Sequence, residues 1–305
     1  MEDKINQLQQ KLKKDPSDFA SMRELAYALT DIGENESALK TLLYLLRIFP
    51  DDANLHYNIG IVYEKLKEFD KSHVEYQKAV RIQPDEPDFM YNLACSYVNR
   101  QEYDKAKPLF LKVLEKDNED SNTLFYLGMI CSRQNLSEEA ADYLEKSVKI
   151  NPEDAIGRFY LANEYKKIGK RDDAFEQYQK VIEISPDYSW AYFNLAAMYW
   201  EDGDVVKSIE NLDMTVELNP HDIDAYKLFI KILMKEDNLP GAIAVAKKAI
   251  KDNPEAGDLY YVAAQVCKKS KDKNNYINYL TNALQYSQSL TISPREVRKE
   301  LNEAK

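Results

Sequence analysis

The chain has 305 residues, of which 44% are hydrophobic and 30% are charged, and it contains only 8 glycines. This composition is ample for a core and suits helices better than sheets. The formal net charge of -11 argues against a general binder of nucleic acid or anionic membranes, because either would need a cationic surface. No run approaches the roughly 18 apolar residues of a membrane span and no signal peptide is visible, so we expect a soluble cytoplasmic protein.

The chain starts with a short amphipathic segment and continues as a repeat. In residues 1–18, Ile5, Leu8 and Leu12 share one helical face. After them, proline recurs on a 34-residue ladder, and proline cannot continue a helix interior, so each rung ends one helical hairpin and opens the next. The rungs are Pro16, Pro50, Pro84, Pro152, Pro186, Pro220 and Pro254, with Asn118 on the rung that lacks proline. The expected hairpins are 19–52, 53–86, 87–120, 121–154, 155–188, 189–222, 223–256 and 257–290.

Each hairpin carries two small residues where its helices must approach closely. In 155–188 they are Ala162 on the first helix and Ala174 on the second, and Gly169 marks the turn between the helices. Small residues occupy both positions in most other hairpins, and an added side chain at such a crossing would overpack it. The exceptions are Ile230 and Tyr276, in the last two hairpins, whose packing is therefore expected to be less regular.

The C-terminal segment 291–305 has the signals of one more helix. Ser293 can cap it, Pro294 suits its first position and Glu296 its third. Val297 and Leu301 then share a face that could cover the eighth hairpin. We therefore expect capping helices at both ends of the stack, since a terminal repeat would otherwise expose an apolar face.

The residue pattern of the hairpins resembles the tetratricopeptide repeat (TPR). The segments Tyr192–Tyr199 and Phe125–Cys131 carry the first-helix pattern of aromatic residue, Leu and Gly or Ala, and proline closes the second helix. The resemblance covers residues 19 to about 290. It implies an all-α fold, a single right-handed α-solenoid domain of helix-turn-helix repeats over 1–305. It also implies that the first helices line a concave groove.

The resemblance also implies which residues face this groove. They are those at the second, fifth, sixth, ninth, twelfth and thirteenth positions of each repeat. Aromatic side chains there could anchor a partner, and amides and phenols could bond an extended backbone. The alternative is that these aromatics and amides, which are common in the family, only support the neighbouring helix. The candidate peptide-binding residues are Tyr57, Asn58, Tyr91, Asn92, Phe125, Tyr126, Phe159, Asn163, Lys166, Lys167, Trp190, Phe193, Asn194, Trp200, Lys227, Lys231 and Lys235.

The sixth hairpin has the strongest binding signal. Trp190, Phe193, Ala197 and Trp200 are spaced i, i+3, i+7 and i+10, and they form a second apolar stripe beside the packing stripe. Tryptophan is favoured at binding hot spots, although neighbouring repeats could equally bury these side chains. The lysines of the fifth, seventh and eighth hairpins, the last being Lys268 and Lys269, suggest a basic half of the groove and an acidic segment in the partner, with a solvated lysine face as the alternative.

We find no catalytic constellation, metal site or cofactor motif in the sequence. The three histidines are scattered, the three cysteines lie in mid-helix positions without paired spacing, and no glycine-rich phosphate loop is present. We therefore predict a non-catalytic protein–protein interaction scaffold that binds an extended peptide or partner segment. The alternative is a regulatory or substrate-presenting subunit or module of an enzyme whose catalytic part lies on another chain or on a missing continuation. The sequence leaves the partner's identity and the oligomeric state open.

Overall fold

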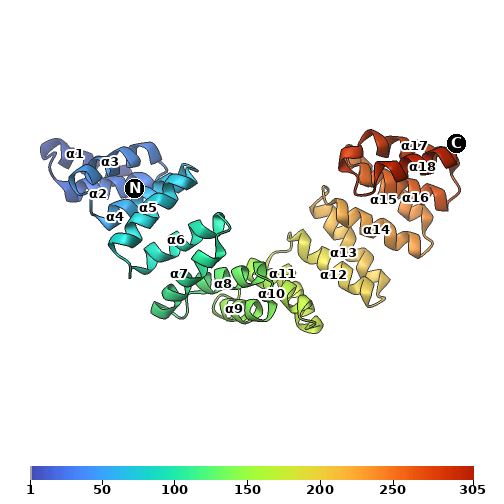
Figure 1. Cartoon of the computed structure of the whole chain (residues 1–305), viewed down its shortest axis with the longest axis horizontal. Coiled ribbons are helices and arrows are strands. Elements are labelled where there is room, and N and C mark those ends of the chain that lie inside the picture. Colours follow the sequence, from blue (N-terminus) through green and yellow to red (C-terminus); the bar gives the residue numbers. More distant parts are fainter. Residues whose placement is uncertain (1) are drawn as a thin grey trace. The chain divides into compact units, whose positions relative to one another are not determined.

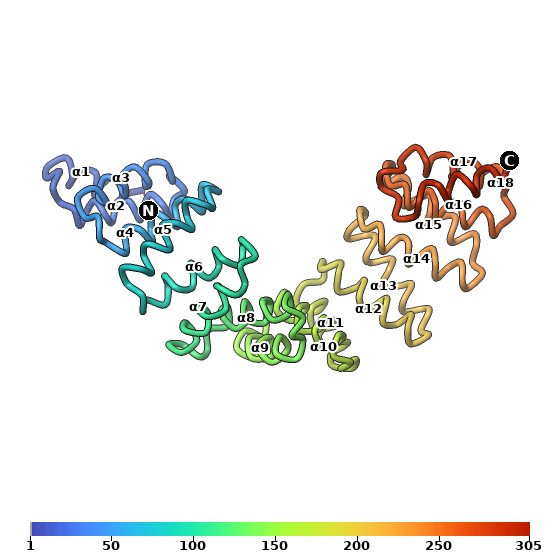
Figure 2. Tube along the Cα trace, in the orientation of Figure 1, coloured from blue at the N-terminus to red at the C-terminus, as the bar shows by residue number. Residues whose placement is uncertain are grey.

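The computed structural model describes residues 2–305, and within that range it contains α-helices, one 3-10 helix and turns but no β-strand. Successive helices form antiparallel pairs in the cartoon, and the Cα trace can be followed through each pair in the tube view (Figures 1 and 2). The helices are α1 Glu2–Lys14, α2 Phe19–Asp31, α3 Asn35–Ile48, α4 Ala53–Lys65, α5 Phe69–Ile82, α6 Pro87–Asn99, α7 Tyr103–Lys116, α8 Ser121–Arg133, α9 Ser137–Ile150, α10 Ala155–Lys167, α11 Arg171–Ile184, α12 Ser189–Glu201, α13 Val205–Leu218, α14 Ile223–Lys235, α15 Leu239–Asp252, α16 Gly257–Lys269, α17 Lys273–Gln285, η1 Ser287–Ser289 and α18 Pro294–Ala304.

The chain divides into two compact units. The first ends at Pro152 and holds α1–α9, and the second, Glu153–Lys305, holds α10–α18. Within each unit the two helices of a pair pack on each other, and the second helix of one pair packs on the first helix of the next. The all-α repeat fold predicted from the sequence is confirmed.

The crossings inside the helix pairs are as tight as the small residues predict. Ala162 on α10 and Ala174 on α11 are both fully buried. A Cβ added at Gly60 on α4 would lie 2.5 Å from Cε1 of Tyr76 on α5, well inside van der Waals contact. Bulk at these positions would therefore overpack the crossing.

The two large residues at crossing positions are matched by small ones on the facing helix. Ile230 on α14 is fully buried in the same cluster as Ala242 on α15. Tyr276 on α17 is 8% exposed and shares a cluster with the fully buried Ala264 on α16. Each of the last two crossings therefore holds one large and one small residue, whereas the other six hold two small ones.

Every turn inside a helix pair uses the left-handed backbone region at the same place in the repeat. Glycine occupies three of the eight turns, and other residues occupy five. The positive φ angles are Gly33 84°, Lys67 61°, Gln101 60°, Asn135 60°, Gly169 79°, Gly203 82°, Asp237 57° and Lys271 60°. The turns of all eight helix pairs thus share this backbone geometry whether or not the residue is glycine.

Aspartates cap several first helices. In α10 the Asp154 carboxylate accepts from the backbone N–H of Gly157 at 3.0 Å, which satisfies an N–H that has no partner within the helix. The same bond is made by Asp18, Asp52, Asp120 and Asp222 at the starts of α2, α4, α8 and α14.

The terminal helices lie against the ends of the two units. Ile5 and Leu8 of α1 are buried in the core cluster of α2 and α3. Val297 of α18 is fully buried and Leu301 is 8% exposed, in one cluster with Leu280 of α17. Each terminal helix therefore covers apolar surface of its neighbouring pair.

Candidate functional site

In the first unit, the candidate groove residues on α4 and α6 are bonded to each other. The Asn92 side chain donates to the Tyr57 hydroxyl at 2.9 Å, and the Tyr57 ring lies 4.7 Å from that of Phe89. Asn58 instead donates to the carbonyl of Asn54 in its own helix at 2.7 Å. All three candidates are half-buried. Their contacts are those of residues that support neighbouring helices, the alternative given above.

The aromatics of α6 and α8 form a continuous cluster. The Tyr126 ring stacks on Phe110 at 5.3 Å between centroids and meets Tyr91 edge-on at 6.0 Å. Phe125 contacts Tyr126 at 5.7 Å. Burial raises the pKa of Tyr126 to about 12 and that of Cys95, beside it, to about 12. These phenols therefore stay protonated and form part of the inter-repeat packing.

In the second unit, the aromatic cluster around Phe159 differs because one member is open to solvent. Phe159 on α10 is only 6% exposed, and its ring contacts Tyr188 at 5.0 Å and Trp190 at 6.2 Å. Trp190, in the first turn of α12, is 57% exposed. Residues 187–190 also line an open cavity of about 270 Å³. A buried ring thus supports an exposed indole beside a small cavity.

A second exposed apolar residue, Ile156, was not among the residues selected from the sequence. Ile156 occupies the same repeat position on α10 as Trp190 does on α12, and it is 52% exposed. A signal was present in the sequence, because only these two repeats have a large apolar residue at the second position. The full set is Ala20, Asn54, Asp88, Asn122, Ile156, Trp190, Asp224 and Asp258.

The two tryptophans, which the sequence analysis placed on one stripe, differ in burial in the structure. Trp200 and Phe193 are half-buried against the core cluster that holds Ala196 and Leu212. The ammonium of Lys235 lies 4.4 Å from the centroid of the Trp200 ring, within the range of a cation–π contact. Trp200 therefore contributes to packing between α12 and α14, whereas Trp190 contributes mainly surface.

The amides near these rings also have partners within the protein. Asn194 donates to the Trp190 carbonyl at 2.9 Å along α12. Asn163 accepts from the hydroxyl of Tyr178, on α11, at 2.6 Å. Burial raises the pKa of Tyr178, so that hydroxyl keeps its proton and this bond. Both amides still lie half-exposed beside the aromatic surface.

Acidic side chains neutralise part of the lysine set. Lys227 on α14 lies 3.1 Å from Asp258 and 3.4 Å from Asp224. Burial alone would lower the pKa of Lys227, but hydrogen bonds and charge attraction from these carboxylates outweigh it and raise that pKa. Lys167 likewise pairs at 2.6 Å with Glu164, which is 1% exposed.

Two lysines of the eighth hairpin are also paired, Lys268 with Glu300 and Lys269 with Asp237. Lys166, Lys231 and Lys235 are exposed cations of the candidate set. None of the three has an acidic partner within residues 2–305. Fewer lysines are therefore available to a ligand than the sequence suggested.

Two further properties concern the whole described chain. Between residues 2 and 305, no group of three or more His, Cys, Asp and Glu side chains is placed to hold a metal ion. Over the same residues, no helix combines the length and the apolarity needed to cross a membrane.

Comparison with known families decides the classification. One family, described as TPR repeat, matches residues 26–67 and 162–203. Two further families, both described as tetratricopeptide repeat, match residues 53–86 and 91–155. The chain belongs to the TPR family. Its helix pairs, their 34-residue period and their small crossing residues are those of TPR repeats, and its architecture is that of a protein-interaction scaffold.

Several solved structures share this TPR fold. YrrB, a TPR protein with an unusual peptide-binding site, is 23% identical over 60% of this chain and 95% of its own, with a TM-score of 0.53. PilF of Pseudomonas aeruginosa is 18% identical over 66% of this chain and 92% of its own, with a TM-score of 0.57. A chain of the APC/C hetero-tetramer Cut9–Hcn1 is 15% identical over 87% of this chain and 51% of its own, with a TM-score of 0.57. Among curated proteins none matches this chain significantly in sequence. At these identities the likeness is one of fold.

Proposed function

We propose that this TPR protein is a non-catalytic scaffold that binds an extended segment of a partner protein in a concave groove along the first helices of its second unit. The observation that carries the proposal is the exposed Trp190 indole, which contacts the buried ring of Phe159. Ile156, three residues before Phe159 on α10, is exposed as well. A rigid aromatic side chain presents a large contact area for little loss of conformational entropy. Trp190 is therefore the anchor of the proposed site.

The residues around this anchor suit an extended peptide. The half-exposed amides of Asn163 and Asn194 each keep hydrogen-bonding capacity beyond the bond they already make, so they can bond a peptide backbone. Phe193 and Trp200 continue the apolar surface along α12. The fold similarity to YrrB, whose peptide-binding site is described as unusual, supports peptides as the ligand class.

The exposed lysines favour an acidic flank in the partner. Lys166 lies on α10, and Lys231 and Lys235 lie on α14, on either side of the helix that holds Trp190. Exposed charges of this kind raise the association rate and orient the ligand more than they add to affinity. The compensated Lys227 contributes less, because Asp224 and Asp258 already hold it.

The experiment uses peptides selected from a random library on the wild-type protein and then titrated against single variants. Trp190→Ala should weaken binding by about 30-fold, the effect of losing a hot spot worth about 2 kcal/mol. Val206→Ala is the matched control, since Val206 is a 67% exposed apolar residue on the second helix of the same repeat. Unchanged affinity in the Trp190 variant, or equal losses in both variants, would remove this site.

The charge component is tested separately. The double variant Lys231→Ala/Lys235→Ala should slow association with acidic peptides and flatten its salt dependence, while the dissociation rate changes little. Lys251→Ala, an exposed lysine on the second helix α15, is the control. Selected peptides without acidic residues, bound equally well by all three proteins, would contradict the acidic flank and leave the aromatic anchor intact.

A further inference from the structure

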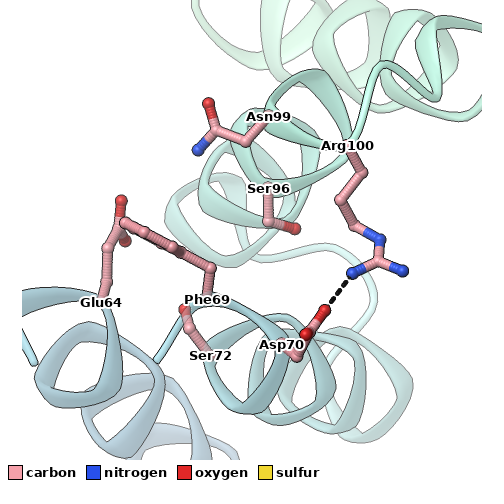
Figure 3. Close-up of a pocket in the computed structure, with 7 residues that line it drawn as sticks. All are labelled: Glu64, Phe69, Asp70, Ser72, Ser96, Asn99 and Arg100. Carbon is pink, nitrogen blue, oxygen red and sulfur yellow. Dashed lines mark hydrogen bonds and ion pairs between the residues drawn. The ribbon is translucent and has the colours of Figure 1, made fainter. Parts of the chain in front are cut away.

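A cavity in the first unit lies where α4, α5 and α6 meet, and it is independent of the Trp190 surface. Its volume is about 470 Å³, which is within the range of ligand pockets. Figure 3 shows Ser72 of α5 and Ser96 of α6 facing its interior, with the Phe69 side chain across one side. More of its wall is carbon than nitrogen or oxygen, although most of the lining residues are polar.

The cavity exists because Ser96 replaces a larger side chain. Ser96 is the tenth residue of its repeat, and apolar residues with 0% exposure hold that position in five others, namely Val62, Ile130, Met198, Ile232 and Val266. The first repeat has Ala28 there, and the fifth has the buried, ion-paired Glu164. Ser96 alone is half-buried rather than buried at this position. The space that a large apolar side chain fills in five other repeats is therefore open here.

Neighbouring side chains are held so that they do not fill this space. The Ser96 hydroxyl donates to the Leu93 carbonyl at 2.7 Å and lies 2.8 Å from Nδ1 of His73 on α5. The His73 ring is fixed in turn against Tyr97, 4.7 Å away. In the other repeats the position of His73 holds Leu39, Lys107, Ala141, Phe175, Ile209, Ile243 and Ile277, so six of the seven are apolar. Polar residues therefore lie on both sides of the interface between α5 and α6.

The rim is suited to a peptide rather than to an ion. Arg100 bonds Asp70, as Figure 3 shows, and also Glu102, so the guanidinium charge is compensated within the protein. Asn99 is exposed at the rim and is the only neutral residue at the thirteenth repeat position, where every other repeat has a charged side chain. An amide can both donate to and accept from a peptide backbone. Phe69, 55% exposed, adds an apolar wall.

We propose that this cavity binds a branched aliphatic side chain, valine, isoleucine or leucine, of a partner peptide, while Asn99 bonds the adjacent peptide backbone. The side chain would occupy the place that Val62, Ile130, Ile232 and Val266 occupy in their own repeats. The ligand thereby completes the interface between α5 and α6 in trans. The cavity volume exceeds that of one such side chain, which leaves room for the backbone on either side.

The test titrates acetylated and amidated glycine pentapeptides with one central residue, isoleucine, leucine, lysine or glutamate, into isotopically labelled protein. The isoleucine and leucine peptides should cause saturable shifts of the Ser72, Ser96 and Asn99 amide resonances, and the lysine and glutamate peptides should not. Ser96→Ile should fill the cavity and abolish the saturable shifts. Ser37→Ile, the same change at an exposed serine of α3, should leave them unchanged.

Folding of the variants is checked in the same experiment, since the amide spectrum reports it. Phe69→Ala provides a second variant at an exposed position and should weaken binding several-fold without disturbing the spectrum elsewhere. The proposal would be overturned if neither the isoleucine nor the leucine peptide caused saturable shifts. Equal shifts from the charged peptides, or undiminished binding by a folded Ser96→Ile protein, would overturn it as well.

Discussion

Exchanging glycine and non-glycine residues at the left-handed turn position should change stability in opposite directions. An L-residue in this region costs about 1 to 2 kcal/mol. At Gly169 an added Cβ would meet nothing within 4 Å, so Gly169→Ala introduces backbone strain alone. The reduced entropy of the unfolded chain offsets about 0.4 to 1 kcal/mol of that strain. We therefore expect Gly169→Ala to destabilise the protein by about 1 kcal/mol.

The reverse change should stabilise the turns that lack glycine. Lys67 and Gln101 have φ angles of 61° and 60° and are exposed, so Lys67→Gly and Gln101→Gly should each add about 0.5 to 1 kcal/mol. Asn135→Gly should add less, because asparagine tolerates this region better. The order of the three gains is thus part of the prediction.

The assay is urea unfolding, with the slope used to confirm that only stability changes. Amide hydrogen exchange localises each effect to its repeat, because stability in a stack of repeats is a sum of local and nearest-neighbour contributions. A shift of the Gly169→Ala and Lys67→Gly midpoints in the same direction would refute this account of the turns.

Two further changes probe the crossings and the C-terminal helix. Ala162→Leu should destabilise by about 1 to 3 kcal/mol through overpacking, whereas exposed Glu183→Ala on α11 should stay within about 0.5 kcal/mol in thermal unfolding. Glu300 of α18 accepts from Tyr261, Gln265 and Tyr276; burial raises its pKa, but these bonds outweigh burial and hold the pKa below its usual value. The ionised Glu300 carboxylate therefore adds about 1 kcal/mol or more to the free energy of unfolding above about pH 4.3, and this stabilisation is lost as pH falls through the lowered pKa. Hydrogen exchange of α16–α18 should show that acid loss in wild type and not in Glu300→Gln.

The fold could be predicted from the sequence because its determinants are local and periodic. Proline spacing fixed the helix ends, as at Pro186, two residues after α11 ends at Ile184. The rung without proline kept the period, since α7 ends at Lys116 and Asp120 caps α8. Ile230 and Ala242 were both visible in the sequence as the residues of one crossing, but the full burial of the larger one between the two helices is seen only in the structure.

The candidate site was harder to predict, because exposure depends on the neighbouring helix. Trp190 and Trp200 have equivalent places on one stripe, yet Trp190 is 57% exposed while Trp200 packs against the core. Trp200 packs against the core cluster and contacts Lys235 on α14, and no spacing within α12 encodes either contact. The exposed Ile156 was readable only by comparing one position across all repeats.

The charges of the proposed groove follow from where partners lie along the period. Asp224 is three residues before Lys227 and Asp258 is 31 residues after it, so this lysine is neutralised by its own helix and by the next first helix. Lys231, one helical turn on, faces neither carboxylate and stays exposed. A partner acid can gain from Lys231 without displacing an internal ion pair, whereas at Lys227 it would compete with a carboxylate, Asp258, that is 6% exposed. The positive charge that steers an acidic segment is therefore expected at the ninth and thirteenth positions of α14 rather than at its fifth.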